Sequence, residues 1–398
     1  MMNTSRNSIP PSIYALGFGI FAMVTSELQV TGMMPVMAQS LSVSISSIGY
    51  LISIYAFAMA VGGPLLTMLL LRFAPKAGLM ILYATFLIGE VLGAMAPSYG
   101  SLIVARLITG AVSGAFFGVA LAICVELVDP KMHGRGISIV LGGLMLGTVL
   151  GLPLASLVGD HFGWRESFWS VSLLSLVSWL VSMGMVPALA KKGHASLAEE
   201  LSALKSKKLW AAFSTSMLII GATYSAFSYF TPILKDVAGF SSNWVSILLL
   251  VYGAATVIGN NIVGRLADRH TIPVLVSGLV LLAAFLTLFG LFVTSKAIVV
   301  VALIGVGLVG VTMNPAMVTR VMRTANGRPL VNTVHTSVIT MGVVVGAFLG
   351  GIGISAGFGL LSPLWIGVAM AVAGLISLWP EMRGTPAGEA AKVARQAR

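Results

Sequence analysis

Residues 12–37, with the sequence SIYALGFGIFAMVTSELQVTGMMPVM, decide the fold of this protein. Glu27 is the single charged residue in this stretch, which exceeds the roughly 20 apolar residues that a helix needs to cross a bilayer. Comparable stretches recur along the 398-residue chain, which is 57% hydrophobic and 9% charged. A soluble domain carries about 25% charged residues. The composition therefore predicts a polytopic membrane protein and excludes a soluble enzyme, a disordered chain and a disulfide scaffold.

Charged residues, prolines and glycines divide the apolar sequence into twelve predicted spans. We place the spans at residues 12–37, 46–71, 77–97, 100–126, 136–158, 166–187, 209–234, 242–263, 271–293, 297–319, 330–355 and 362–380. The predicted fold class is therefore an all-α polytopic membrane protein with six helices in each of two halves. A β-barrel is disfavoured, because its strands would alternate over segments of about 10 residues.

The domain boundaries follow from these spans. We expect residues 1–187 to form the N-terminal half, 188–208 a linker, 209–380 the C-terminal half and 381–398 a tail. Within the linker, Ser196 and Glu199 have the spacing of a capping box. Leucines at 197, 201 and 204 then fall on one helical face. This pattern predicts a short amphipathic helix at the membrane surface, although a plain linker is the alternative.

The basic residues test both the number of spans and their orientation. Of the 23 Lys and Arg residues, 19 fall on the side that holds both predicted termini. The other side holds Arg165, Lys235 and Lys296, and Arg106 lies within a span. Positive residues concentrate in cytoplasmic loops, so we expect both termini in the cytoplasm. The net charge of +11 is explained by this orientation, and we expect no nucleic-acid partner.

Three motifs carry a family resemblance. They read Thr25-Ser26-Glu27 with Gly32-Met33-Met34-Pro35, then Arg106-Leu107-Ile108-Thr109-Gly110, then Gly143-Leu144-Met145-Leu146-Gly147 with Gly151-Leu152-Pro153. Through their order and spacing the chain resembles a major facilitator superfamily transporter over nearly its whole length. It is most similar to the twelve-span drug:proton antiporter group, in the branch of bacterial sugar, purine-nucleoside and chloramphenicol exporters. Three residues depart from that branch, because Ser113 stands where His is frequent, and Glu90 and His335 where Asn is frequent.

The resemblance implies a function. We expect proton-coupled efflux of small neutral or weakly cationic molecules, such as chloramphenicol-like drugs, nucleosides or sugars, by alternating access in the bacterial inner membrane. A proton-coupled importer is the alternative, and a non-transporting membrane enzyme or receptor is a remote one. The expected partners are a small-molecule substrate, protons and the lipid bilayer, with the chain acting as a monomer.

An enzyme is disfavoured on the residues themselves. The five His residues are scattered, and the sequence contains no His-x-x-x-His pair, no Cys cluster and no G-x-x-x-x-G-K-[ST] loop for ATP. Its one Cys, Cys124, lies in an apolar run. We therefore expect neither a cofactor nor a metal.

Three ionisable residues inside the spans are candidates for proton coupling. Glu27 lies about 10 residues, or roughly 15 Å, from the outer end of its span, near the midplane. Without water a carboxyl group favours its neutral form, so Glu27 can be a proton acceptor, a substrate contact or a hydrogen-bonded structural residue. Glu90 and Arg106 lie at similar depth on consecutive antiparallel spans and can form a buried ion pair. Glu90 can serve this structural pair or the coupling itself.

Further polar and aromatic residues are candidates for the substrate cavity. They are Glu27, Ser113, Phe117, Tyr224, Asn260, Asn314 and His335. The asparagines can equally join helices by hydrogen bonds. A histidine near the inner surface can simply be solvated.

The loops and motifs supply two more groups of candidates. The resemblance implies inner-side ion pairs that hold the halves together in the outward-open state, and solvated loop charge is the alternative. The candidates are Arg72, Glu126, Arg135, Asp268 and Arg269. The motif residues expected to permit close helix contact or a bend are Gly110, Gly147, Gly151 and Pro153.

Overall fold

A computed structural model describes residues 9–70, 72–129, 133–189, 206–324 and 329–383. Within these ranges every regular element is helical, and twelve helical segments are long and apolar enough to cross a membrane. The predicted all-α fold with twelve spans is therefore confirmed. The capping box and amphipathic helix expected in the linker fall mostly on residues 190–205, outside the described residues.

The N-terminal half contains eight α-helices and two π-helical segments that form six spans. They are α1 (Pro11–Leu41), α2 (Ile45–Phe57), η1 (Ala58–Gly62), α3 (Gly63–Leu70), α4 (Pro75–Ala94), α5 (Tyr99–Leu127), α6 (His133–Leu146), η3 (Gly147–Gly151), α7 (Leu152–His161) and α8 (Trp164–Met185). Spans 2 and 5 each continue through a π-helical segment, in which the backbone hydrogen bonds join residues five apart instead of four.

The C-terminal half also forms six spans. Its elements are α10 (Lys207–Phe227), α11 (Phe230–Pro232), η4 (Ile233–Val237), α12 (Ser242–Leu291), α13 (Lys296–Val309), η5 (Val311–Met313), α14 (Asn314–Thr324), α15 (Pro329–Gly353), η6 (Ile354–Phe358) and α16 (Ser362–Arg383). Helix α12 contains two spans, Ser242–Ala267 and His270–Leu291. They are separated by a kink at His270, whose backbone is non-helical.

Local sequence explains where several helices begin. Pro11 and Pro75 occupy the first turns of α1 and α4, where the missing N–H has no intrahelical partner to lose. The side chain of Ser44 caps α2 by accepting from the backbone N–H of Ser47, at 3.1 Å. Ser98 and Ser101 form a capping box at the start of α5.

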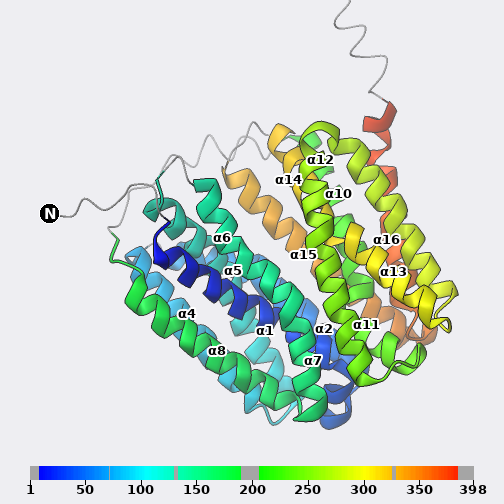
Figure 1. Ribbon diagram of the computed structural model, residues 1–398, viewed down its shortest axis with the longest axis horizontal. Helices are drawn as coiled ribbons and strands as arrows, with labels where there is room; N and C mark the ends of the chain where they lie inside the picture. Colours follow the sequence, from blue (N-terminus) through cyan, green and yellow to red (C-terminus); the bar gives the residue numbers. More distant parts are fainter. Residues whose placement is uncertain (1–8, 71, 130–132, 190–205, 325–328, 384–398) are drawn as a thin grey trace, which may run out of the picture.

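The two halves lie side by side, and both ends of the described chain lie at the same end of the bundle (Figure 1). We call this end the terminal side. The first span of each half is the most enclosed. In its most apolar 18-residue window, 78% of the residues are buried in α1 and 83% in the span that begins with α10, against 33–50% in the other spans. Outer helices expose residues such as Ile88, Leu173 and Ile376, as lipid contact requires. Because α1 and α10 are shielded from lipid, they can carry the polar residues of a site.

Candidate functional site

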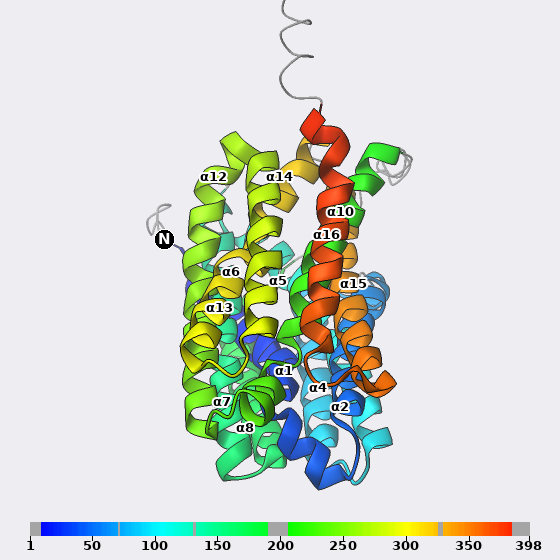
Figure 2. The same cartoon turned by 90° about the vertical axis from the view of Figure 1, so that its right-hand side faces the viewer.

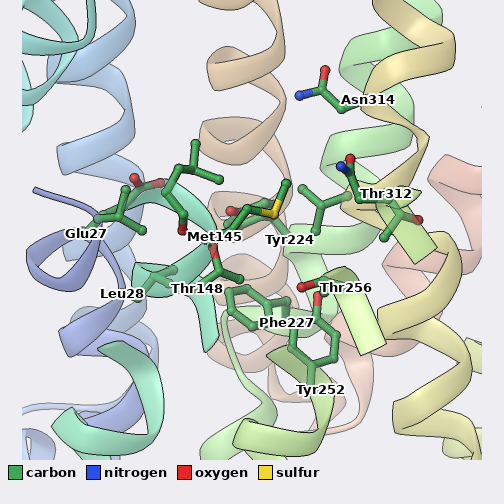
Figure 3. A pocket seen from close by; sticks show the side chains of 14 residues that line it. Glu27, Leu28, Met145, Thr148, Tyr224, Phe227, Tyr252, Thr256, Thr312 and Asn314 are labelled. Carbon is green, nitrogen blue, oxygen red and sulfur yellow. Dashed lines mark hydrogen bonds between the residues drawn. The ribbon is translucent and has the colours of Figure 1, made fainter. Parts of the chain in front are cut away.

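A cavity of about 180 Å³ lies between the two halves, and helices of both halves line it (Figure 3). The N-terminal half contributes Val24, Glu27, Leu28, Leu144, Met145 and Thr148. The C-terminal half contributes Tyr224, Phe227, Tyr252, Thr256, Asn260, Val311, Thr312 and Asn314. Four residues that the sequence predicted for a substrate cavity thus meet here: Glu27, Tyr224, Asn260 and Asn314.

Glu27 is the only charged residue in the lining of this cavity. Its side chain is half-buried and makes no hydrogen bond or ion pair with another of the described residues. It lies across the cavity from Tyr224 and Asn314 (Figure 3). A carboxyl group in this place can bind and release a proton or contact a ligand.

The threonine hydroxyl groups of the cavity are oriented so that their oxygens can accept hydrogen bonds. Each donates its hydroxyl proton to a carbonyl of its own helix: Thr148 to Leu144 at 3.0 Å, Thr256 to Gly253 at 2.7 Å and Thr312 to Leu308 at 2.7 Å. Such a hydroxyl keeps its oxygen lone pairs available. Together with Glu27, these oxygens favour a ligand that carries donors.

Aromatic rings form the wall of the cavity away from the terminal side. Phe227 stacks on Tyr252 with ring centroids 5.0 Å apart, and Tyr224 meets Phe227 edge-on at 5.3 Å. These side chains gather at one end of the cavity (Figure 3). The Tyr252 hydroxyl is buried and has no hydrogen-bond partner among the described residues. A buried phenol usually finds a partner, so the Tyr252 hydroxyl is an exception among the polar groups of the cavity.

Behind Glu27, a fully buried arginine forms hydrogen bonds with the backbone of α1. Arg106 on α5 donates from Nη1 to the carbonyl of Ser26 at 2.8 Å and from Nη2 to the carbonyl of Glu27 at 3.1 Å. Its guanidinium also lies over the ring of Tyr55, 4.0 Å from the centroid. The Nε atom has no partner among the described residues. These contacts tie the backbone beside Glu27 to α5 and α2.

Glu90 on α4 is also fully buried, but it does not form the direct ion pair with Arg106 expected from their depth. The hydroxyl of Ser26 donates to Glu90 Oε1, and the amide of Gln29 donates to Oε2 at 3.1 Å. Ser26 lies between the two charges, with its hydroxyl oxygen 3.5 Å from Arg106 Nη1. The direct pair is absent because the Nη atoms of Arg106 donate to α1 carbonyls and Ser26 occupies the intervening position.

Ser113, predicted for the cavity, lies instead beneath Tyr55. The hydroxyl groups of Ser113 and Tyr55 are 2.5 Å apart, and the Tyr55 hydroxyl also donates to the carbonyl of Met23 at 3.3 Å. Ser113 is fully buried and does not line the cavity. It therefore supports the aromatic ring that covers Arg106.

Phe117 and His335, also predicted for the cavity, do not line it. Phe117 is half-buried against the core of the N-terminal half. His335 is fully buried inside the C-terminal half, where its Nε2 lies 2.8 Å from the hydroxyl of Ser216 and its ring stacks on Phe213 at 5.5 Å. The hydrogen bond and the aromatic stack give His335 a packing role in this arrangement.

The glycines of the sequence motifs permit close helix contact. A side chain at Gly147 or Gly151 would overlap residues of α1, and one at Gly110 would overlap the Tyr55 carbonyl. Pro153 is buried in the first turn of α7, directly after the π-helical segment. The motif residues therefore set the distance of α1 and α2 from their neighbours, which places Glu27 and Tyr55.

The residues predicted for inner-side ion pairs lie on the terminal side. Arg72 is exposed after α3, and Glu126 is half-buried near the end of α5. The side chains of Arg135, Asp268 and Arg269 fall outside the described residues. The arrangement therefore leaves these ion pairs as a prediction.

On the side away from the termini, side chains join the two halves. Thr231 donates to the carbonyl of Thr31 at 2.7 Å, and Lys235 forms an ion pair with Asp160 at 3.1 Å. The Thr31 carbonyl would bond to the N–H of residue 35 in a regular helix, but that residue is Pro35 and has none. A hydroxyl from the other half thus takes the place of a missing helix donor.

Sequence reasoning missed several residues of the site, and one pattern could have found some of them. Tyr252 and Thr256 precede the predicted Asn260 at intervals of four residues, and all three line the cavity. This spacing places them on one face of a helix. Ser26 and Gln29, which contact Glu90, are neutral residues in an apolar span. Ser26 belongs to the Thr25-Ser26-Glu27 motif, but nothing in the sequence predicts a contact of either residue with Glu90.

Comparison with known proteins identifies the family. The profile described as Major Facilitator Superfamily matches residues 14–328. The chain belongs to the Major Facilitator Superfamily. Its members are transporters that act on small-molecule substrates in membranes, so this chain is a multi-pass transporter and not an enzyme. The six-plus-six arrangement of helices around a central cavity is the one expected for this superfamily.

Individual relatives extend this assignment. The inner membrane transport protein YdhP of Escherichia coli is 30% identical over 94% of this chain and 96% of its own length. The chloramphenicol resistance protein of Streptomyces lividans is 30% identical over 93% of this chain and 96% of its own length. The human organic anion transporter MFSD10 shares the fold, with a TM-score of 0.64 at 12% identity, over 93% of this chain and 100% of its own.

Proposed function

We propose that this transporter is an exporter of the bacterial inner membrane that exchanges protons for a small neutral or weakly cationic molecule. The observation that carries the proposal is Glu27, the single charged residue bordering a cavity that both halves line. Protonated Glu27 is neutral and leaves the cavity without charge. Ionised Glu27 is an acceptor for a substrate donor or a partner for a cation. Proton and substrate can thus compete for one carboxyl group.

Alternating access would link this competition to transport. The two halves rock around the cavity, so that Glu27 meets one side of the membrane and then the other. Substrate leaves when Glu27 takes up a proton on the outer side, and the proton is released on the inner side.

The cavity favours substrates with an apolar or aromatic body and hydroxyl or amine donors. Aromatic rings of Tyr224, Phe227 and Tyr252 offer stacking surface, whereas the threonine oxygens and Glu27 accept hydrogen bonds. Chloramphenicol combines an aromatic ring with hydroxyl groups, and nucleosides combine a heterocycle with a sugar. The name of the Streptomyces relative supports the choice of chloramphenicol as the first test substrate.

Transport in proteoliposomes tests the proposal. Chloramphenicol, nucleosides and sugars are supplied in turn under an imposed pH gradient, and substrate should move opposite to the proton flux. Movement of substrate with the protons would contradict export and favour an importer.

The variant Glu27→Gln sharpens this test. It should lose the gradient-driven rate by at least about tenfold, because a neutral amide cannot carry the proton. Substrate exchange without a gradient should persist. Glu166→Gln is the matched control, since Glu166 is exposed at the start of α8. Full gradient-driven transport by Glu27→Gln would overturn the role of Glu27.

A further inference from the structure

The site contains two carboxyl groups and one guanidinium, and their surroundings differ. Glu90 and Arg106 are both 0% exposed, whereas Glu27 is half-buried beside the cavity. Burying a charge in an apolar interior is costly unless an opposite charge and hydrogen bonds compensate it. One guanidinium can compensate one carboxylate, so the contacts of Glu90 decide which carboxyl group keeps its charge.

The hydrogen bonds around Glu90 all run toward it. Arg106 Nη1 approaches the hydroxyl oxygen of Ser26 at 3.5 Å, so the Ser26 proton is directed to Glu90. The Ser167 hydroxyl donates to Gln29 Oε1 at 3.3 Å, which turns the Gln29 amide nitrogen toward Glu90. Both oxygens of Glu90 thus accept a hydrogen bond, an arrangement that suits an ionised carboxylate, which has acceptors only. The chain of donors therefore starts at the cation and ends at Glu90.

We propose that Glu90 is the fixed counter-charge of Arg106, linked to it through Ser26, and that this pairing leaves Glu27 as the carboxyl group that titrates. The inference rests on the proposed function and deepens it. It makes Glu90 a positioning residue, which acts on proton exchange through Ser26 and Arg106 without meeting substrate. Glu27 touches Arg106 only through its backbone carbonyl, so its side chain is free to change its charge.

Other ionisable groups near Glu27 do not disturb this balance. Those that face it from the helices packed around it are neutral phenols apart from the pair already described. They are Tyr55 of α2, Tyr224 of α10 and Tyr252 of α12, with Arg106 of α5 and Glu90 of α4. Asp160 and Lys235, at the far end of the bundle, are paired with each other.

Infrared absorption of protonated carboxyl groups, recorded against pH on the purified protein in lipid, tests the inference without any substrate. We expect one buried carboxyl band that titrates in the wild type and is lost in Glu27→Gln. In Glu90→Gln the band should persist, with its midpoint about one pH unit lower, because uncompensated Arg106 then stabilises ionised Glu27. Glu166→Gln should leave both band and midpoint unchanged.

Two results would overturn the inference: an unchanged midpoint in Glu90→Gln, or loss of the band in Glu90→Gln with retention in Glu27→Gln. Ser26→Ala provides a second test if Glu90→Gln does not fold, because it keeps both charges and removes only the bridge. It should shift the midpoint in the same direction by a smaller amount. A purely structural role for Glu90 and Ser26 would lower the yield of folded protein and leave the midpoint unmoved.

A different result would contradict the proposed proton-coupled export. That proposal fails if the wild type shows no transport driven by a pH gradient for any substrate of the chloramphenicol, nucleoside and sugar panel. The infrared midpoint still assigns the charges in that case, because it requires no transport.

Discussion

On the N-terminal side of the cavity, the side chains of Ser26, Gln29 and Glu90 bond to one another behind Glu27, and Arg106 bonds to the same helix. On the C-terminal side, the polar groups are neutral, and the buried hydroxyl of Tyr252 lacks a partner among the described residues. Both sides border the same cavity. Their polar groups nevertheless meet different requirements.

The difference follows from the cost of burying each kind of group. A buried charge left unpaired costs several kcal/mol, so the N-terminal side must supply permanent partners for Arg106 and Glu90. An unpaired neutral hydroxyl costs about 1–3 kcal/mol, which a protein can tolerate until a ligand binds. The charges on the N-terminal side are thus held by permanent partners, whereas on the C-terminal side an unpaired neutral hydroxyl is left for a ligand.

The largest expected effect comes from removing the cation of the N-terminal side. Arg106→Leu leaves Glu90 buried without its counter-charge and should lower the free energy of unfolding by about 3–5 kcal/mol. Arg320→Leu is the matched control in the C-terminal half. Arg320 is 6% exposed but pairs with Glu381, which is 43% exposed and stays solvated when its partner is lost. The control should cost about 1 kcal/mol.

Thermal unfolding in detergent, followed by tryptophan fluorescence, measures both variants. Arg106→Leu should unfold at a clearly lower temperature than Arg320→Leu. Equal losses of Tm would contradict a difference between the two halves in how they bury charge.

Two tyrosine variants should differ in their effect on stability. Tyr55→Phe breaks the 2.5 Å hydrogen bond to Ser113 and should destabilise the protein by about 1 kcal/mol. Tyr252→Phe removes a hydroxyl that has no partner in the described part of the chain, and the substrate-free protein should be equally or more stable. If substrate supplies that partner, Tyr252→Phe should also raise KM several-fold with kcat unchanged. Lower stability of Tyr252→Phe without substrate would show that its hydroxyl is already paired.

The smallest expected effect concerns the contact between the halves away from the terminal side. Thr231→Val removes the donor to the Thr31 carbonyl and should weaken this contact by about 1 kcal/mol, which changes a two-state population about fivefold. Lys235→Met breaks a partly exposed ion pair and should have a smaller effect.

Spin labels at exposed Gln39 and Asn243, in a Cys124→Ala background, can report the separation of the halves. We expect a larger fraction of long distances between the two labels in Thr231→Val than in the parent protein. An unchanged distance distribution would show that the hydrogen bond does not hold the halves together.

The sequence determined the helical spans and allowed the depth of the ionisable residues to be predicted. Span length and hydropathy are local properties, because the bilayer has one thickness for every helix. Depth follows from counting along a helix, and on this basis Glu90 and Arg106 were expected at similar depth. The same reasoning singled out Glu27 as a charge near the midplane. The face of a helix is also readable, as the spacing of Tyr252, Thr256 and Asn260 shows in retrospect.

Only the tertiary structure decided which faces meet. Depth allowed a direct pair between Glu90 and Arg106, but the rotation of α1 placed Ser26 between them. The packing of α5 against α2 likewise turned Ser113 toward Tyr55, and Tyr252 and Thr256 of α12 line the cavity although sequence reasoning had passed over them. The rotation and spacing of a helix depend on contacts such as those of Gly147 and Gly151 with α1. Those contacts join residues far apart in the chain, so no pattern within one span can specify them.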